Sequence, residues 1–333
     1  MSFQVKAAGH ASGSSRFLLS FVNMDVIDLH THGIAGRDTR CGHVEDLLAI
    51  AEAQGAAGVS SIVLSLYPAA IPVMRGQLVL VREAMERQER GTRFEARGTR
   101  NEEEPATRNP QPATAFAPPG AARILGAHLE GPFLNPSRAG ALDAAAFLRP
   151  SKAAFGELIE GFEDIVKVMT VAPELPDALP LIGKASEAGI IVAMGHSDAT
   201  YTEAQAGFKA GARSVTHLFN AMRGFHHREP GLAGFGLLDE QVYVEVVADP
   251  YHLDMKTLDL LFRVKDPERV IIVSDSVRET KMGADDAVRN ASSRLLGGSL
   301  TMVEAADRLA YLGFPQEAVR GAITANPARL LGL

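Results

Sequence analysis

Short apolar runs alternate with helix-like segments along most of this 333-residue chain. Such short runs favour buried strands, because helices of globular proteins need longer periodic segments. We predict eight strands, over residues 26–33, 59–64, 124–130, 165–171, 190–194, 214–216, 242–248 and 270–274. Eight strands in alternation with helices are typical of a (β/α)8 TIM barrel, an α/β fold in which the carboxyl ends of the strands meet at one mouth.

Helical periodicity marks several connections between these strands. We predict helices over residues 44–54, 71–90, 179–188 and 315–330, the last being the eighth helix of the barrel. Between about residues 91 and 120 aliphatic residues nearly disappear, so we predict a flexible surface insertion there, with a lid as the alternative. Residues 1–23 are predicted to be a separate N-terminal segment with a short strand at 17–22, and the barrel then occupies residues 24–333.

The overall charge and the cysteine content exclude several classes of protein. A net charge of −7 and a pI near 5.8 argue against a nucleic-acid surface, which needs clustered Lys and Arg. The single cysteine, Cys41, can form neither a disulfide framework nor a thiolate metal cluster. No run approaches the roughly 18 apolar residues of a transmembrane helix, and no signal peptide is evident. We therefore predict a cytoplasmic protein with no membrane partner.

Polar side chains stand at the ends of the predicted strands. His30 and His32 lie two residues apart and therefore point to the same side of the first strand. At any one strand end a satisfied core histidine would look the same, but ten randomly placed histidines would seldom put four there. The residues at these ends are His30, His32, Glu130, His196, His217 and Asp275. This set suits Zn²⁺ or a similar divalent ion, bound by imidazole and carboxylate with one position open for water.

Two of the polar residues allow more than one interpretation. Asp275 follows the eighth strand and could exchange a proton with an attacking water, although an aspartate there could by itself be a helix N-cap. His128 lies on the same face of its strand as Glu130, one pleat away. It either packs in the core or orients a metal ligand, and packing is the preferred interpretation.

Seven sequence blocks occur in order from residue 28 towards the end of the chain. They are DLHTHG (28–33), HLEGPF (128–133), APE (172–174), GHSDAT (195–200), THLFNAM (216–222), REPGLAG (228–234) and GSLTM (298–302). On these blocks the chain resembles the N-acetylglucosamine-6-phosphate deacetylase family of the amidohydrolase superfamily. The resemblance implies metal-dependent removal of the acetyl group from N-acetylglucosamine 6-phosphate, or from a close N-acetyl amino sugar phosphate, by a homodimer.

The resemblance also implies roles for the residues at the strand ends. Glu130, His196 and His217 would hold the main ion, and His30 and His32 would allow a second one. Zn²⁺ is the first choice of metal, with Fe, Co and Mn as alternatives. Asp275 would act as the general base and then as the general acid.

Substrate contacts are implied by position in the same way. Asn220, Ala221 and His252 would contact the sugar phosphate. His227 and Arg228 would reach an anion across the dimer interface, and the rigid donor fork of arginine suits a phosphate.

The chain departs from the family pattern in several places. The family's accessory β-sandwich is predicted to be missing or vestigial, because only residues 1–23 precede the first strand. The insertion at 91–120 is atypical, and Leu142 stands where the family usually has a histidine that contacts the substrate. Ser276-Val277 follow Asp275 where small residues such as Ala are more usual. Two alternatives therefore remain: an amidohydrolase acting on a different small or cyclic amide, and a catalytically silent paralogue with a binding role.

Overall fold

The computed structural model describes residues 24–98, 120–284, 286–291 and 293–333. The N-terminal segment 1–23, with the strand predicted at 17–22, and most of the predicted insertion lie outside these residues. Within the described ranges, no helix has both the length and the apolar character needed to cross a membrane.

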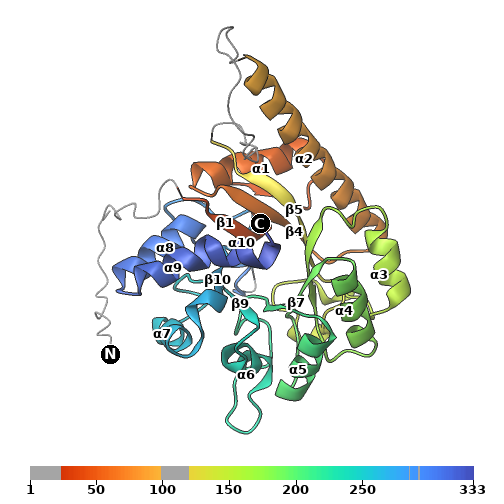
Figure 1. Cartoon of the computed structure of the whole chain (residues 1–333), viewed down its shortest axis with the longest axis vertical. Coiled ribbons are helices and arrows are strands. Elements are labelled where there is room, and N and C mark those ends of the chain that lie inside the picture. Colours follow the sequence, from red (N-terminus) through yellow and green to blue (C-terminus); the bar gives the residue numbers. More distant parts are fainter. Residues whose placement is uncertain (1–23, 99–119, 285, 292) are drawn as a thin grey trace, which may run out of the picture.

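Eight parallel strands form one curved sheet (Figure 1). In order around the sheet they are β1 (Ile27–Thr31), β4 (Ser61–Leu66), β5 (Arg123–Glu130), β6 (Val166–Val171), β7 (Ile191–Met194), β8 (Ser214–Val215), β9 (Tyr243–Val246) and β10 (Val270–Ile272). Their order in space follows their order in the chain, and helices lie between them. The predicted (β/α)8 barrel is confirmed.

Main-chain hydrogen bonds from the segment after β10 bring the two edges of the sheet together. The amide of Asp275 donates to the carbonyl oxygen of His30 at 2.9 Å. The amides of His32 and Gly33 both donate to the carbonyl oxygen of Ser276, at 2.8 and 3.1 Å. The barrel is therefore nearly closed, and the seam between its edges runs directly past His30, His32 and Asp275.

Helices surround the sheet (Figure 1). They are α1 (Val44–Ala56), α2 (Ile71–Gly98), α3 (Lys152–Ile159), α4 (Ala178–Glu187), α5 (Tyr201–Ala210), α6 (Gly231–Leu238), α7 (Met255–Val264), α8 (Met302–Tyr311), α9 (Gln316–Ile323) and α10 (Ala325–Leu331). A small hairpin pairs β2 (Gly33–Ile34) with β3 (Arg37–Asp38), and 3-10 turns occur at Pro136–Arg138, Ala144–Ala146 and Pro267–Arg269.

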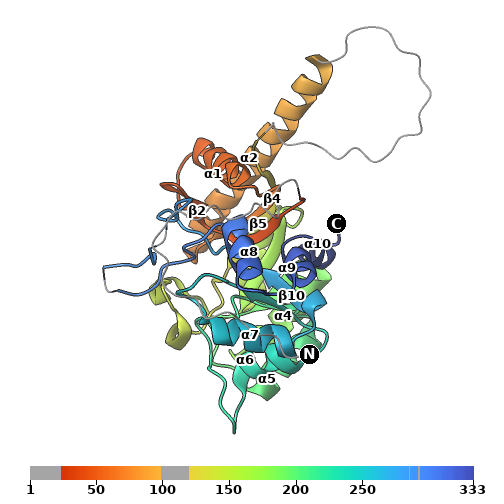
Figure 2. The ribbon, with the colours of Figure 1, turned by 90° about the vertical axis from the view of Figure 1, so that its left-hand side faces the viewer.

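Two helices differ from the sequence-based expectation. The helix predicted to end at Arg90 continues to Gly98, so the first part of the segment predicted as a flexible insertion is helical; Figure 2 shows this end of α2 extending beyond the body of the molecule. Extending an existing helix avoids the cost of nucleation, which composition alone does not reveal. The single helix predicted at 315–330 is two helices that meet at Thr324. Pro327 explains the break, because its ring excludes a continuous helix through the carbonyl of Ile323.

The hydrophobic core leaves the carboxyl ends of the strands to polar side chains. The main cluster lies between the sheet and the helices, where Ile62 and Leu64 of β4 are fully buried together with Leu47 of α1. A smaller cluster joins β1, β4, β9 and β10 to α10 through residues such as Val63 and Leu330.

Candidate metal centre

The six polar residues predicted at the strand ends come together in the structure. β1 carries His30 and extends into His32, β5 ends at Glu130, and the chain leaves β7, β8 and β10 at His196, His217 and Asp275. The four imidazoles and Glu130 are all buried, with at most 3% of each residue exposed.

The Glu130 carboxylate lies at the centre of this cluster. Its Oε1 is 3.1 Å from His196 Nε2 and 3.2 Å from His217 Nε2. Its Oε2 is 3.1 Å from His32 Nε2, and His30 Nε2 is 3.5 Å from Oε1. The described residues therefore include two sets that could each hold a metal ion, Glu130–His196–His217 and His30–His32–Glu130, and Glu130 belongs to both.

The arrangement of the imidazoles fits a cation. Nε2 of His30 is 3.1 Å from Nε2 of His32, and Nε2 of His196 is 3.1 Å from Nε2 of His217. Within the described part of the chain, the buried Nδ1 atoms of His30, His32 and His217 have no hydrogen-bond partner. Nε2 atoms that face one another across a carboxylate are well arranged to share a positive ion.

Electrostatics keep the central carboxylate ionised. Burial by itself would raise the pKa of Glu130, but the charge of His30 and hydrogen bonds from the other imidazoles hold it well below its usual range. Burial also opposes the charged form of His217, yet the hydrogen bond and charge of Glu130 outweigh it and raise the pKa of that ring to about 9. Burial lowers the pKa of the His30 imidazole well below its usual value, although the charge of Glu130 opposes this shift.

Unusual backbone angles aim three of these side chains into the centre. His196, His217 and Asp275 have φ values of 46°, 31° and 48°, in the left-handed region that side chains other than glycine rarely adopt. Strain of this kind persists where the surrounding structure over-determines it, and it concentrates at functional sites. Gly195 permits the tight approach of β7 to its neighbours, since a Cβ there would lie 2.9 Å from Thr216 Cβ.

Asp275 faces the second set of imidazoles. Its Oδ1 is 3.4 Å from His30 Nε2 and 3.8 Å from His32 Nε2, and its side chain keeps 15% exposure, more than the other members of the cluster. Burial, and then the charge of Glu130, raise the pKa of this carboxyl. A partly accessible carboxyl with a raised pKa suits proton exchange.

His128 is not available as a ligand. Its Nδ1 is 3.0 Å from Ser65 Oγ and its Nε2 is 2.8 Å from Thr170 Oγ1, so both ring nitrogens are engaged. Its ring meets that of His30 edge to face at 4.5 Å. Burial lowers the pKa of His128 to about 3. The residue packs, as preferred from the sequence, and hydrogen bonds also fix its orientation under His30.

The predicted substrate residues divide into two groups. Ala221 lies near the His196 ring, because a Cβ on Gly140 would be 3.1 Å from Ala221 Cβ and 3.6 Å from His196 Cε1. Asn220 precedes it in the same loop and is half-buried. His252 is nearly buried, and its Nδ1 is 2.9 Å from Asp249 Oδ2.

His227 and Arg228 belong to the second group, which is exposed. They occupy the loop before α6, where His226 and Glu229 form an isolated bridge and Arg228 Nη1 lies 3.1 Å from His227 Nε2. In Figures 1 and 2 this loop projects from the body of the molecule. Among the residues that the structure describes, no hydrogen bond or ion pair joins this loop to the metal ligands.

Sequence reasoning missed Tyr67. Its ring stacks on His32 with the centroids 3.9 Å apart, and the Arg40 guanidinium lies 4.3 Å from the centre of the same ring. The strand predicted to end at residue 64 runs to Leu66, so Tyr67 follows a strand end like the other site residues. A correct strand boundary would have revealed it.

Comparisons with known proteins agree with this geometry. No family model matches the sequence. An N-acetylgalactosamine-6-phosphate deacetylase from Escherichia coli O157:H7 is 30% identical over 322 residues, which cover 92% of this chain and 77% of that protein. An N-acetylglucosamine-6-phosphate deacetylase from Lysinibacillus sphaericus is 36% identical over 165 residues, but this match covers 48% of this chain and only 42% of that protein.

Solved structures extend the agreement to the fold. N-acetyl-D-glucosamine-6-phosphate deacetylase from Mycobacterium smegmatis, in complex with N-acetyl-D-glucosamine-6-phosphate, superposes with a TM-score of 0.75 at 26% identity, over 93% of this chain and 77% of that one. The Thermotoga maritima N-acetylglucosamine-6-phosphate deacetylase gives 0.73 at 25% identity, over 93% and 78%.

Fold and site together define a metal-dependent hydrolase built on a (β/α)8 barrel. Within that class, the similarity along most of the chain identifies a narrower group. The chain belongs to the N-acetylglucosamine-6-phosphate deacetylase family of the amidohydrolase superfamily, whose named members act on C–N amide bonds.

Proposed function

We propose that this chain hydrolyses the acetamide of N-acetylglucosamine 6-phosphate, or of a close N-acetyl amino sugar phosphate, to acetate and the amino sugar phosphate. The observation that carries the proposal is the convergence of four imidazoles on the Glu130 carboxylate at the mouth of the barrel. Membership in a family of amide-cleaving enzymes supports the same conclusion.

Glu130, His196 and His217 are proposed to hold the main ion, and His30 and His32 a second one that shares the Glu130 carboxylate. Zn²⁺ is the metal that imidazole and carboxylate ligands favour, while Fe, Co and Mn remain open to measurement. A divalent ion bound there supplies a Lewis acid that polarises the amide carbonyl and makes a nearby water more acidic.

Asp275 is proposed to move the proton. Its partly accessible carboxyl, with Oδ1 3.4 Å from His30 Nε2, can accept a proton from the attacking water and return it to the departing nitrogen. The proton that leaves the water is therefore the one that converts the leaving group into an amine, and no other proton donor is required.

Recognition of the sugar phosphate is proposed to involve Asn220, Ala221 and His252 of the same subunit. His227 and Arg228 are exposed on a projecting loop, which supports a role in a homodimer where the loop reaches the partner's substrate phosphate. Location in the cytoplasm also remains a prediction.

The choice between the glucosamine and the galactosamine substrate is open. Of two relatives that align over 92% of this chain, one is named for the galactosamine compound and one for the glucosamine compound, and the family resemblance implies that Leu142 replaces a histidine that contacts the substrate. An unpaired substrate hydroxyl costs about 1–3 kcal/mol, which is enough to change the preference between two epimers.

Acetate release from four compounds tests the proposal: the 6-phosphates of N-acetylglucosamine and N-acetylgalactosamine, and both sugars without phosphate. We expect one phosphate ester to be the best substrate and each free sugar to be much poorer. Equal rates with and without phosphate would contradict the proposed preference for a sugar phosphate. They would favour the alternative of an amidohydrolase that acts on a different small amide. Metal analysis of the same preparation distinguishes the metal-dependent enzyme from a catalytically silent paralogue, because the paralogue need not hold a stoichiometric ion.

A further inference from the structure

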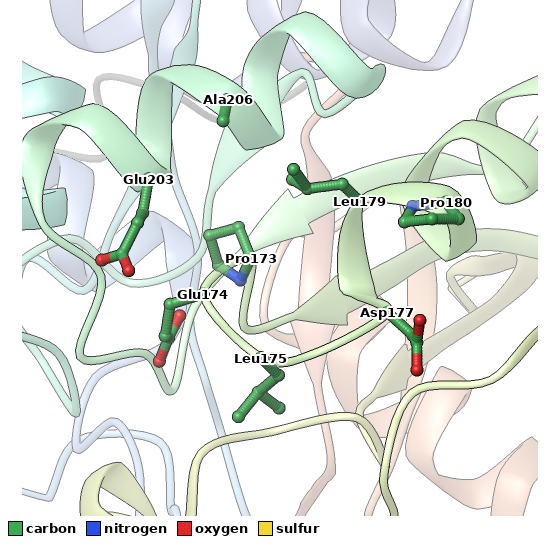
Figure 3. Close-up of a pocket in the computed structure, with 8 residues that line it drawn as sticks. All are labelled: Pro173, Glu174, Leu175, Asp177, Leu179, Pro180, Glu203 and Ala206. Atoms are coloured by element: carbon green, nitrogen blue, oxygen red, sulfur yellow. The ribbon is translucent and has the colours of Figure 1, made fainter.

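Glu174 follows β6 and belongs to neither of the two sets of candidate metal ligands found among the described residues. It lines a cavity of about 260 Å³ together with residues of the β6–α4 connection, α4 and α5 (Figure 3). Figure 3 shows Glu174 and Glu203 towards one side of this cavity and Asp177 towards the other. Glu174 shares this cavity with two other acids, Glu203 and Asp177, yet it accepts its hydrogen bonds from residues that do not line the cavity.

The donors of those hydrogen bonds are the two residues that follow His196 and the side chain of Asn135. Glu174 Oε1 accepts from the amide of Asp198 at 2.6 Å and from Asn135 Nδ2 at 2.9 Å. Its Oε2 accepts from Ser197 Oγ, also at 2.6 Å. One carboxylate thus holds both residues that follow His196.

Asn135 holds His196 from its other side. Its main-chain amide donates to the carbonyl oxygen of His196 at 2.9 Å. Glu174 and Asn135, which come from two different strand ends and bond each other, therefore fix the main chain at and after this one ligand. We call this pair the His196 clamp.

The backbone of His196 needs such support. Its φ of 46° is left-handed, a conformation that is unfavourable for residues other than glycine. This conformation accompanies a ring position in which Nδ1 lies 3.0 Å from the carbonyl oxygen of Arg138 and Nε2 points at Glu130. Relaxation of the backbone towards ordinary angles would turn the ring away from Glu130.

We propose that Glu174 is a positioning residue that sets the metal affinity of the Glu130–His196–His217 group through the His196 clamp, without touching the ion. The inference rests on the proposed metal-dependent function. Partners that orient a ligand typically change metal affinity 10–100-fold when they are removed. A contact that served only stability would lower the melting temperature of the metal-free protein and leave its affinity for the ion unchanged.

Zn²⁺ titration against a coloured chelator tests the inference on the full chain. We expect Glu174→Ala to weaken binding at one site about 10–100-fold. Glu174→Gln keeps an oxygen that can accept from Asp198 and Asn135, so it should stay within about threefold of the wild type. Asp177→Asn is the matched control, because it removes a charge from the same cavity at a residue whose side chain makes no capping hydrogen bond. It should bind Zn²⁺ as the wild type does.

Melting of each metal-free variant shows whether it folds. If Glu174→Ala does not fold, Ser197→Ala decides the matter. It removes the one hydrogen bond to Glu174 Oε2, together with the bond that Ser197 Oγ accepts from the amide of Ala199, and it should weaken Zn²⁺ binding several-fold. Unchanged affinity in the folded variant that is tested overturns the inference and leaves the proposed function intact. A wild-type chain that binds none of Zn²⁺, Fe²⁺, Co²⁺ and Mn²⁺ in the same titration overturns the proposed function and this inference with it.

Discussion

The residues at the mouth of the barrel differ in their solvent exposure. Glu130 and the four imidazoles are almost fully buried, whereas the Asp275 side chain keeps 15% exposure. A proton carrier must exchange with water, and a ligand need not. The difference supports separate roles for Asp275 and Glu130, although both are carboxylates within reach of His30.

Replacement of the proton carrier separates chemistry from metal binding. We expect Asp275→Asn to retain its metal while kcat falls at least about 100-fold, because the amide cannot accept a proton at neutral pH. Steady-state rates and metal content measured on the same sample check this. Near-normal turnover in the metal-loaded variant would contradict the assignment.

Glu245 on β9 links stability to pH. The residue is 1% exposed and accepts a hydrogen bond from Ser214 Oγ at 2.8 Å, and burial raises its pKa from 4.5 to about 7. A carboxyl with a higher pKa in the folded state binds its proton more tightly there, so stability falls as pH rises from about 4.5 to 7. Above that window the buried charge costs on the order of 3 kcal/mol.

Glu245→Gln should remove this dependence, because glutamine stays neutral and can still accept from Ser214. We expect the metal-free variant to melt several degrees higher than the wild type at pH 8, and to gain much less at pH 5. Thermal unfolding at the two pH values measures the difference. Glu187→Gln, at an exposed position of α4, is the control and should show no such gain. An equal gain at both pH values would argue against titration of Glu245.

At the scale of elements, side chains as well as main-chain hydrogen bonds join the seam between β10 and β1. Gln54 of α1 donates through Nε2 to Thr31 Oγ1 at 2.9 Å and to Ser276 Oγ at 3.0 Å, and the two hydroxyls are 2.8 Å apart. Thr31, the last residue of β1, lies between His30 and His32, and Ser276 follows Asp275. One helix side chain therefore connects both sides of the seam beside the metal centre.

Removal of that side chain should loosen the seam. We expect Gln54→Leu to lower the free energy of unfolding by about 1–3 kcal/mol, since it deletes the donor to two buried hydroxyls. Denaturant unfolding of the metal-free protein checks this. Gln77→Leu on α2 is the comparison, because Gln77 is also buried and its Oε1 accepts no hydrogen bond from the residues that the structure describes. If Gln77→Leu lowered the free energy of unfolding more than Gln54→Leu does, the hydrogen bonds of Gln54 across the seam would not explain the effect.

At the scale of the whole molecule, the loop before α6 exposes groups that the proposed function needs. Phe225 is 55% exposed beside His227 and Arg228, an arrangement that suits contact with another subunit. A loop that serves the partner's site explains why these residues do not meet the metal ligands within the described chain. The catalytic unit would then be a symmetric dimer.

Mixing two inactive variants tests the shared site. Asp275→Asn lacks the proton carrier and Arg228→Ala lacks the phosphate contact, so a hybrid dimer would contain one complete site if Arg228 acts on the partner. Random exchange makes half of the dimers hybrids, and we expect about a quarter of wild-type activity to return. Each variant mixed with itself is the control. Absence of recovery in hybrids whose formation is verified would place Arg228 in its own subunit's site or outside the reaction.

Much of this protein could be predicted from local patterns. Apolar runs and their spacing indicated eight strands and a barrel, because burial on both faces makes a strand recognisable from its own residues. His30, His32, Glu130, His196 and His217 could be found for a related reason: the carboxyl ends of barrel strands meet at one mouth whatever the intervening segments are. The convergence of the candidate ligands could therefore be predicted without any interatomic distance.

Only the tertiary structure decided how those residues meet. The sharing of the Glu130 carboxylate by two sets of imidazoles depends on closure of the barrel, and the direction of His196 depends on Glu174 and Asn135 from other strand ends. The end of α2 at Gly98 and the break at Thr324 were likewise not evident from periodicity. Side-chain identity and periodicity are local properties of a sequence, whereas hydrogen bonds between distant segments exist only once the chain has folded.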